Sequence, residues 1–211
     1  MEELFTELIP AREAGSTRLL IALHGLGDSM EGYREVPNML RLPWLNVLLV
    51  NAPDPYYGGF SWYDFAGDPA PGVVRSRGLL AKLLDWARDK YPSEETVLFG
   101  FSQGCLMTLE TGLRYPRKLA GLVGVSGYVH DEHLLARELS PLAKEQRVLW
   151  THGTRDPLIP LAKVKAQMEI LRGAGMTIQW EEFNKEHTIA PREVEVIREF
   201  VAGCFGSKIG A

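Results

Sequence analysis

The chain has 211 residues, of which 45% are hydrophobic and 24% charged, and its formal net charge is −4 at pH 7. This length and apolar content predict one domain over residues 1–211, with a core over about 18–205, and exclude a globally disordered chain. The acidic balance and the scattered Lys and Arg give no electrostatic reason to expect a nucleic acid or an anionic membrane as a partner.

The first residues, the cysteines and the apolar runs indicate the cellular compartment. Cys105 and Cys204 are too few for a disulfide framework. The first residues, MEELFTELIP, lack the basic start and the long apolar run of a signal peptide. No apolar run reaches the roughly 18 residues that a membrane span needs. We therefore expect a cytoplasmic protein without stable membrane insertion.

The first half of the chain predicts three strands, a long loop and a helix. Residues 3–9 are typical of an edge strand, whereas residues 18–23 and 45–50 are apolar at almost every position, as in strands buried on both faces. Residues 52–72 form a connection rich in Pro, Gly and aromatics, which either lines a pocket or packs its own aromatics as a surface crossover. The helix predicted at 73–90 has an apolar stripe, which consists of Leu79, Leu80, Leu83, Leu84 and Trp86.

Strands and helices alternate in the second half as well. Continuous apolar runs predict strands at residues 96–99, 119–125 and 147–151, and an alternating run predicts a strand nearer the sheet edge at 176–182. Helices are predicted at residues 103–114, 161–172 and 191–205, the second followed by Gly173 as its C-terminal glycine. This alternation predicts a three-layer α/β sandwich with a mostly parallel sheet.

A nucleophile motif lies between the strand at 96–99 and the next helix. Residues 100–104, GFSQG, match G-x-S-x-G, in which a sharp turn lifts the serine hydroxyl clear of the sheet. The glycines on either side let strand and helix approach without a Cβ clash. A similar stretch around Ser126 has Tyr128 in place of the last glycine, so we interpret Ser126 as structural. Ser102 is the predicted nucleophile.

A serine nucleophile needs a base, and with this motif the acid follows the serine and a histidine comes last. The histidines are His24, His130, His133, His152 and His187. Chain order excludes the first of them. The next two sit in a polar stretch with no strand end to place them, and the fourth precedes the better acid candidate. His187 follows the strand at 176–182 and precedes the last helix, which places it at the carboxyl edge of the sheet.

Two aspartates compete for the role of the acid. Asp156 follows the strand at 147–151 on a turn fixed by Pro157, again at the carboxyl edge. Asp131 also follows a strand, but its glutamate neighbours favour a solvated helix face. We assign the acid to Asp156, which would orient the imidazole and stabilise its cation.

The loop LHGLGD, residues 23–28, allows two interpretations. A dinucleotide site would need G-x-G-x-x-G, but Met30 replaces the third glycine and no acidic residue ends the next strand. The loop can instead direct a backbone N–H at the oxyanion of an acyl-transfer reaction, together with the N–H of Gln103. We prefer the oxyanion interpretation.

Taken together, LHGLGD, GFSQG, HGTRDPLIP and the late His187 resemble the carboxylesterase/acyl-protein thioesterase (phospholipase/carboxylesterase) family of α/β-hydrolases over about residues 18–205. The resemblance implies an α/β-hydrolase fold, with Ser102, Asp156 and His187 as catalytic residues. It also implies an oxyanion hole made by the backbone N–H groups of Leu26 and Gln103. His24 would brace the oxyanion loop.

Two stretches depart from the family pattern. Cys105 follows GFSQG where many members have another small residue, and we interpret it as a core thiol. Before His187 stand Asn184, Lys185 and Glu186, with Thr188 after it. We expect this charged approach to the base to alter substrate preference.

The sequence thus predicts a serine esterase that cleaves small-molecule or lipid-like esters, and thioesters as an open alternative, of short to medium acyl chains. No insertion is long enough for a lid domain, and the mechanism needs no metal or cofactor. The expected substrate contacts are Phe60, Trp62, Tyr63 and Leu158. The alternatives are a hydrolase for a lactone or peptide bond and a non-catalytic ligand-binding module with a relic triad. Homodimerisation stays open.

Overall fold

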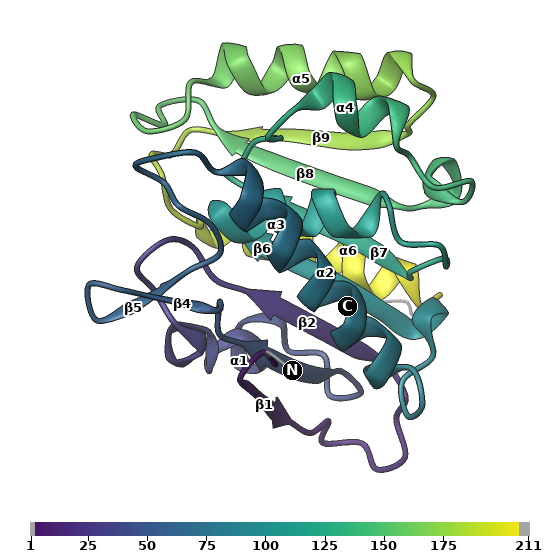
Figure 1. Ribbon diagram of the computed structural model, residues 1–211. Helices are drawn as coiled ribbons and strands as arrows, with labels where there is room; N and C mark the ends of the chain where they lie inside the picture. Colours follow the sequence, from purple (N-terminus) through teal and green to yellow (C-terminus); the bar gives the residue numbers. More distant parts are fainter. Residues whose placement is uncertain (1–2, 207–211) are drawn as a thin grey trace.

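Seven strands form the central sheet in the computed structural model, which describes residues 3–206 (Figure 1). Their order across the sheet is β1-β3-β2-β6-β7-β8-β9. The strands are β1 (Thr6–Ile9), β2 (Leu19–Leu23), β3 (Asn46–Val50), β6 (Thr96–Phe101), β7 (Gly121–Val125), β8 (Val148–Gly153) and β9 (Ile178–Phe183). Edge strand β1 runs antiparallel to β3, and all other neighbours in this sheet are parallel. The mostly parallel α/β sandwich predicted from the sequence is confirmed.

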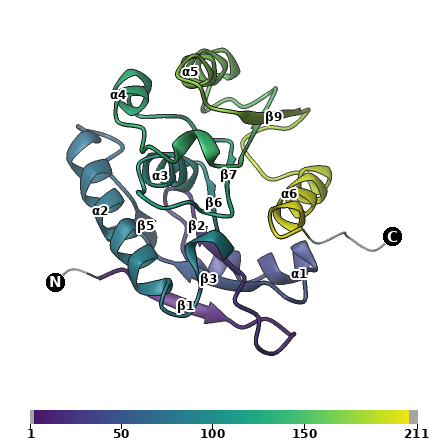
Figure 2. The same cartoon turned by 90° about the vertical axis from the view of Figure 1, so that its right-hand side faces the viewer.

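Helices cover both faces of the sheet (Figure 2). They are α1 (Val36–Leu40), α2 (Ala70–Ala87), α3 (Gln103–Gly112), α4 (Glu132–Arg137), α5 (Leu161–Gly173) and α6 (Pro191–Cys204). Helices α2 to α5 enclose one apolar core with the sheet, and α1 and α6 enclose the other. None of the helices within residues 3–206 combines the length and the apolar character of a membrane span.

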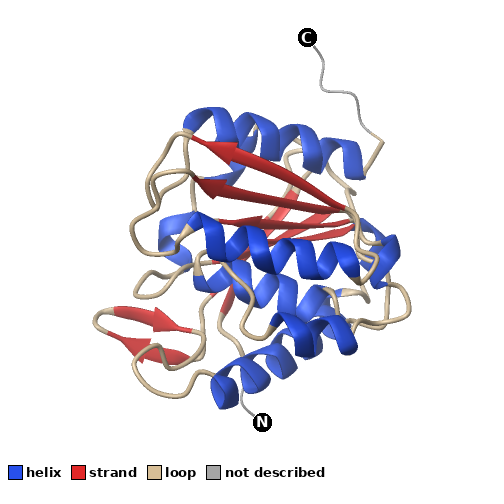
Figure 3. Ribbon diagram, turned by 90° about the horizontal axis from the view of Figure 1, so that it is seen from above, coloured by secondary structure: helices blue, strands red, loops and turns tan. Residues whose placement is uncertain are grey.

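Residues of β2 show why its sequence is apolar throughout. Leu19, Ile21 and Leu23 belong to the core under α2 to α5, while Leu20 and Ala22 belong to the core under α1 and α6. Because successive side chains of a strand point to opposite faces, a strand between two cores needs apolar residues at every position. The parallel strands all point their carboxyl ends to one edge of the sheet, seen from above in Figure 3.

The loop at 52–72 contains structure that the sequence did not predict. Strands β4 (Asp54–Tyr56) and β5 (Gly59–Ser61) form a hairpin beside the main sheet. Its two-residue turn places Tyr57 at φ 42° and Gly58 at φ 89°. Positive φ at both turn residues matches the twist of a tight hairpin, and Tyr at the first of them gives a weaker sequence signal than Asn or Asp.

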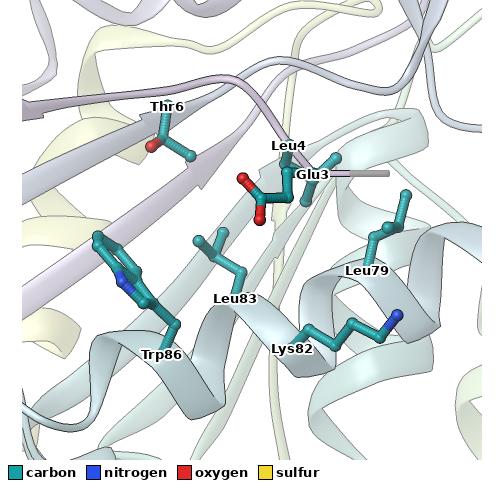
Figure 4. Close-up of a pocket in the computed structure, with 7 residues that line it drawn as sticks. All are labelled: Glu3, Leu4, Thr6, Leu79, Lys82, Leu83 and Trp86. Atoms are coloured by element: carbon teal, nitrogen blue, oxygen red, sulfur yellow. The ribbon is translucent and has the colours of Figure 1, made fainter. Parts of the chain in front are cut away.

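Two details of the predicted helices differ from the structure. Trp86 belongs to the apolar stripe predicted for this helix, yet it is 63% exposed. This side of α2 faces a pocket beside the N-terminal segment rather than packed neighbours, as Figure 4 shows with Leu79, Leu83 and Trp86 around it. Gly173 is the last residue of α5, and the glycine in the left-handed conformation is Gly175, at φ 96°.

Candidate active site

Ser102 lies on a sharp turn between β6 and α3. Its backbone has φ 54° and ψ −114°, which is unusual for a residue with a side chain. A Cβ atom at Gly100 would lie 2.0 Å from the carbonyl oxygen of Gly104, and one at Gly104 would lie 2.1 Å from that of Leu23. The two glycines of the motif are therefore needed for strand and helix to meet at this turn.

His187 joins Ser102 to Asp156. Its Nε2 lies 2.9 Å from Ser102 Oγ, and its Nδ1 lies 2.7 Å from Asp156 Oδ2. Asp156 comes from the loop after β8 and His187 from the loop after β9, so three strand ends supply the three side chains. Each ring nitrogen has one partner, which fixes the imidazole in the orientation that a general base needs.

The carboxylate of Asp156 is held in its ionised form. Burial raises the pKa of this group, but hydrogen bonds from His187 and from the N–H groups of Ile159 and Leu158 outweigh burial, so the pKa lies below its usual value. Both N–H groups lie 2.9 Å from Asp156 Oδ1. This carboxylate holds Nδ1 of His187 through the 2.7 Å contact and so orients the imidazole.

The loop after β2 reaches the other side of Ser102. A Cβ atom at Gly25 would lie only 3.3 Å from Ser102 Cβ. The loop pairs with β5, since the N–H of Gly27 donates to Phe60 O and the N–H of Phe60 donates to Asp28 O, both at 2.9 Å. No hydrogen bond within residues 3–206 uses the N–H of Leu26. Backbone donors beside a serine hydroxyl can stabilise an oxyanion.

Gln103 is the first residue of α3, so its N–H has no partner inside the helix. Its buried side chain faces away from the solvent. Gln103 Oε1 accepts from the N–H of Trp62 at 3.0 Å, and Nε2 donates to Tyr63 O at 3.2 Å. The side chain thus fixes residues 62–63 to the start of α3, while the backbone N–H stays available beside Ser102.

Comparisons with known proteins assign the chain to a family. The chain matches the model of a family described as Phospholipase/Carboxylesterase over residues 6–205. The chain belongs to the phospholipase/carboxylesterase family. It is therefore a hydrolase of the carboxylesterase/thioesterase type with an α/β-hydrolase fold.

Similar sequences and a similar solved structure support this assignment. The chain is 34% identical over 173 residues to acyl-protein thioesterase 1 of Schizosaccharomyces pombe. This alignment covers 74% of this chain and 75% of that protein. It is 34% identical over 169 residues to acyl-protein thioesterase 1 of Yarrowia lipolytica, with 72% and 74% covered. Among solved structures, esterase PE8 superposes with a TM-score of 0.86 at 26% identity, covering 96% of this chain and 99% of that one.

Two other histidines of the protein, His24 and His152, brace loops of the site. His24 Nε2 accepts from the N–H of Ala52 at 3.0 Å, and its Nδ1 lies 2.7 Å from Gly25 O, so His24 braces the loop after β2. His152 Nε2 lies 2.9 Å from Ile159 O in the Asp156 turn. Burial lowers the pKa of both histidines, which favours their neutral forms.

The competing acid lies elsewhere. Asp131 is the N-cap of α4, where its Oδ1 accepts from the N–H of Leu134 at 2.8 Å. That hydrogen bond lowers the pKa of Asp131. Within residues 3–206, neither Asp131 nor His130 or His133 forms a hydrogen bond or ion pair with Ser102. The structure therefore places Asp156, and not Asp131, beside His187.

The predicted aromatic wall is largely inside the protein. Trp62 and Tyr63 are 0% and 1% exposed, and the indole N–H of Trp62 donates to His24 O at 2.9 Å. Trp62 supports the loop after β2, and the Tyr63 hydroxyl lies 3.0 Å from the Tyr128 hydroxyl, so these two buried rings do not form an open wall. Phe60 is partly buried, and Leu158 is 69% exposed.

Lys185 does not form the charged approach to the base that the sequence predicted. It is only 4% exposed, and its Nζ lies 2.7 Å from Glu193 Oε2. Nζ also donates to Ser126 Oγ at 2.9 Å and to Thr188 O at 2.6 Å. The ammonium group ties the His187 loop to α6 and to the end of β7. Ser126 is structural, as predicted, since its hydroxyl accepts from Lys185.

Replacing Lys185 with methionine should destabilise the protein by about 3–5 kcal/mol, because Glu193 would remain as an unpaired buried charge. Urea denaturation of the Lys185→Met variant measures this loss. The double variant Lys185→Met/Glu193→Gln should recover part of it, since the remaining side chains are neutral. A loss below about 0.5 kcal/mol for the single variant would contradict the inferred tie.

Cys105 is a core thiol, as expected. It is fully buried in α3, and burial raises the pKa of its thiol well above the usual range. A thiol in this state is a poor nucleophile.

Proposed function

We propose that this protein hydrolyses carboxylic esters of short to medium acyl chains, and thioesters with them, through a Ser102–His187–Asp156 triad and an acyl-enzyme. The observation that carries the proposal is the hydrogen-bonded chain from Ser102 Oγ through both nitrogens of His187 to Asp156, built on a strained strand-to-helix turn. A serine, a histidine and an aspartate from three strand ends are not expected to form such a hydrogen-bonded chain if they are ordinary surface residues.

In the proposed first step, His187 Nε2 takes the hydroxyl proton of Ser102 as Oγ attacks the ester carbonyl carbon. The N–H groups of Leu26 and Gln103 then bind the oxyanion of the tetrahedral intermediate. Each donor of this kind contributes roughly 10² to 10³ in rate. His187 next gives its proton to the leaving alcohol or thiol, and the acyl group stays on Ser102.

In the second half, a water molecule loses a proton to His187 and attacks the acyl-enzyme. Collapse of the second tetrahedral intermediate releases the carboxylic acid and restores the Ser102 hydroxyl. Asp156 holds the imidazole in place throughout and stabilises its charged form. These steps use groups of this chain, so the proposal includes no metal and no organic cofactor.

The acyl group would meet Phe60 and Leu158, which come from the β5 side and from the Asp156 turn. Leu158 is exposed and Phe60 is partly buried, so they offer an open apolar contact rather than an enclosed tunnel. Such a contact suits short to medium acyl chains. A cytoplasmic location and one domain over residues 1–211 stay predictions, and homodimerisation stays open.

A substrate panel tests the proposal. Purified protein would be assayed against an ester, a thioester, a lactone and an amide that carry the same acyl group, with Ser102→Ala as the blank. We expect the ester and thioester to be hydrolysed at rates that depend on Ser102. Turnover of the lactone or amide alone would move the protein to another substrate class. Equal rates for wild type and Ser102→Ala would contradict the proposed nucleophile.

A further inference from the structure

A cavity of about 320 Å³ lies between α1 and α6, on the sheet face opposite to α3. Figure 2 shows these two helices on the same face of the sheet. Its walls include Val36 and Met39 from α1, Ile189 from the loop before α6, and Val194 from α6. We call it the α1–α6 cavity. Neither Phe60 nor Leu158, the contacts proposed for the acyl group, lines it.

The α1–α6 cavity shares two residues with the surroundings of Ser102. His187 forms part of its wall, and so does Phe101, the residue directly before Ser102. The two rings lie side by side, with their centroids 4.9 Å apart. The cavity therefore begins at the imidazole that the proposed mechanism uses for proton transfer.

Proton transfer fixes where the leaving group has to be. His187 Nε2 must give its proton to the leaving oxygen or sulfur, so that atom lies within hydrogen-bond reach of Nε2. The carbonyl oxygen points instead to the N–H groups of Leu26 and Gln103. The alkyl or aryl group bonded to the leaving oxygen or sulfur is thus directed along the imidazole, where the α1–α6 cavity begins.

We propose that the α1–α6 cavity binds the alcohol or thiol part of the substrate, an inference that rests on the function proposed above. The apolar walls select a neutral alkyl or aryl group. The carboxylate of Asp28 also borders the cavity and would disfavour a leaving group that carries a negative charge. The protein then distinguishes esters by their alcohol as well as by their acyl chain.

Two series of esters test this inference. In one, the acyl group is acetyl and the alcohol lengthens from methyl to hexyl; in the other, the alcohol is methyl and the acyl group lengthens from acetyl to hexanoyl. For wild type, kcat/KM should rise along the alcohol series by up to roughly fourfold per methylene, the effect of removing that group from water. The rise should stop when the cavity is full.

Variants that fill the cavity should remove this gain selectively. Met39→Trp on α1 and Val194→Phe on α6 should each lower the ratio of kcat/KM for hexyl acetate to kcat/KM for methyl acetate by about tenfold or more. The matched control is Asn38→Trp, which adds the same ring to α1 at an exposed neighbouring position outside the cavity wall. It should keep the wild-type preference.

The opposite results would overturn the inference. The first is a wild-type kcat/KM that does not change along the alcohol series, a result that needs no variant. The second is a loss of kcat/KM in the filled variants that affects only the acyl series. Thermal melting of each variant separates loss of fold from loss of the site. The proposed function fails by a different result, namely hydrolysis of methyl acetate by Ser102→Ala at the wild-type rate.

Discussion

Replacing Ser102 with alanine is expected to lower kcat for ester hydrolysis by about 10⁴ to 10⁶ while the fold is kept. The reason is that the hydroxyl 2.9 Å from His187 Nε2 is the group that attacks the carbonyl carbon in the proposed mechanism. Initial rates with a saturating ester substrate measure the change. His187→Ala should cause a loss of similar size, because the two side chains act as a unit.

Ser126 provides a matched control for this experiment. It is also a serine with positive φ, at 48°, after the strand next to β6. Its hydroxyl accepts from Lys185 and does not contact His187 in the described residues. Ser126→Ala should therefore keep kcat within a few-fold of wild type. If Ser126→Ala lost as much activity as Ser102→Ala, the assignment of the nucleophile would be in error.

Replacing Asp156 with asparagine is expected to lower kcat by about 10⁴. The amide keeps the shape of the side chain but removes the charge that stabilises the imidazolium, and it no longer enforces the ring orientation in which Nε2 faces Ser102. Measuring kcat and KM separately shows whether the loss falls on kcat, as it should when catalysis and not binding is affected.

Asp131→Asn is the matched control for the acid, because it makes the same change at the competing aspartate. Asparagine caps a helix about as well as aspartate does, so the stability of α4 should change little. The activity of this variant should equal that of wild type. A few-fold loss for Asp156→Asn together with a large loss for Asp131→Asn would reassign the acid.

The sheet was predictable because its strands lie between two cores. A run such as residues 19–23, apolar at every position, has few other uses in a chain of this length. The order of Ser102, Asp156 and His187 was predictable for a related reason, since parallel strands bring their carboxyl ends to one edge. The residues alone predicted only that the loop at 23–28 provides an N–H donor, and the family resemblance identified that donor as Leu26.

Other parts depended on contacts that no local pattern encodes. Trp62 and Tyr63 look like a substrate wall in the sequence, but a buried Gln103 side chain turns them inward. Lys185 is part of a charged approach to His187 in the sequence, and only the folded chain shows that it pairs with Glu193 in the interior. Trp86 fits an apolar helix stripe, yet this side of α2 has a pocket in place of packed neighbours.

Covalent labelling with a fluorophosphonate probe tests the central claim most directly, because the probe reacts with a serine that a neighbouring base has activated. Mass spectrometry of the labelled protein locates the adduct. We predict an adduct on Ser102 in wild type, no adduct in Ser102→Ala, and greatly slowed labelling in His187→Ala. An unlabelled Ser102 in wild type, together with ester hydrolysis that survives Ser102→Ala, would contradict the account.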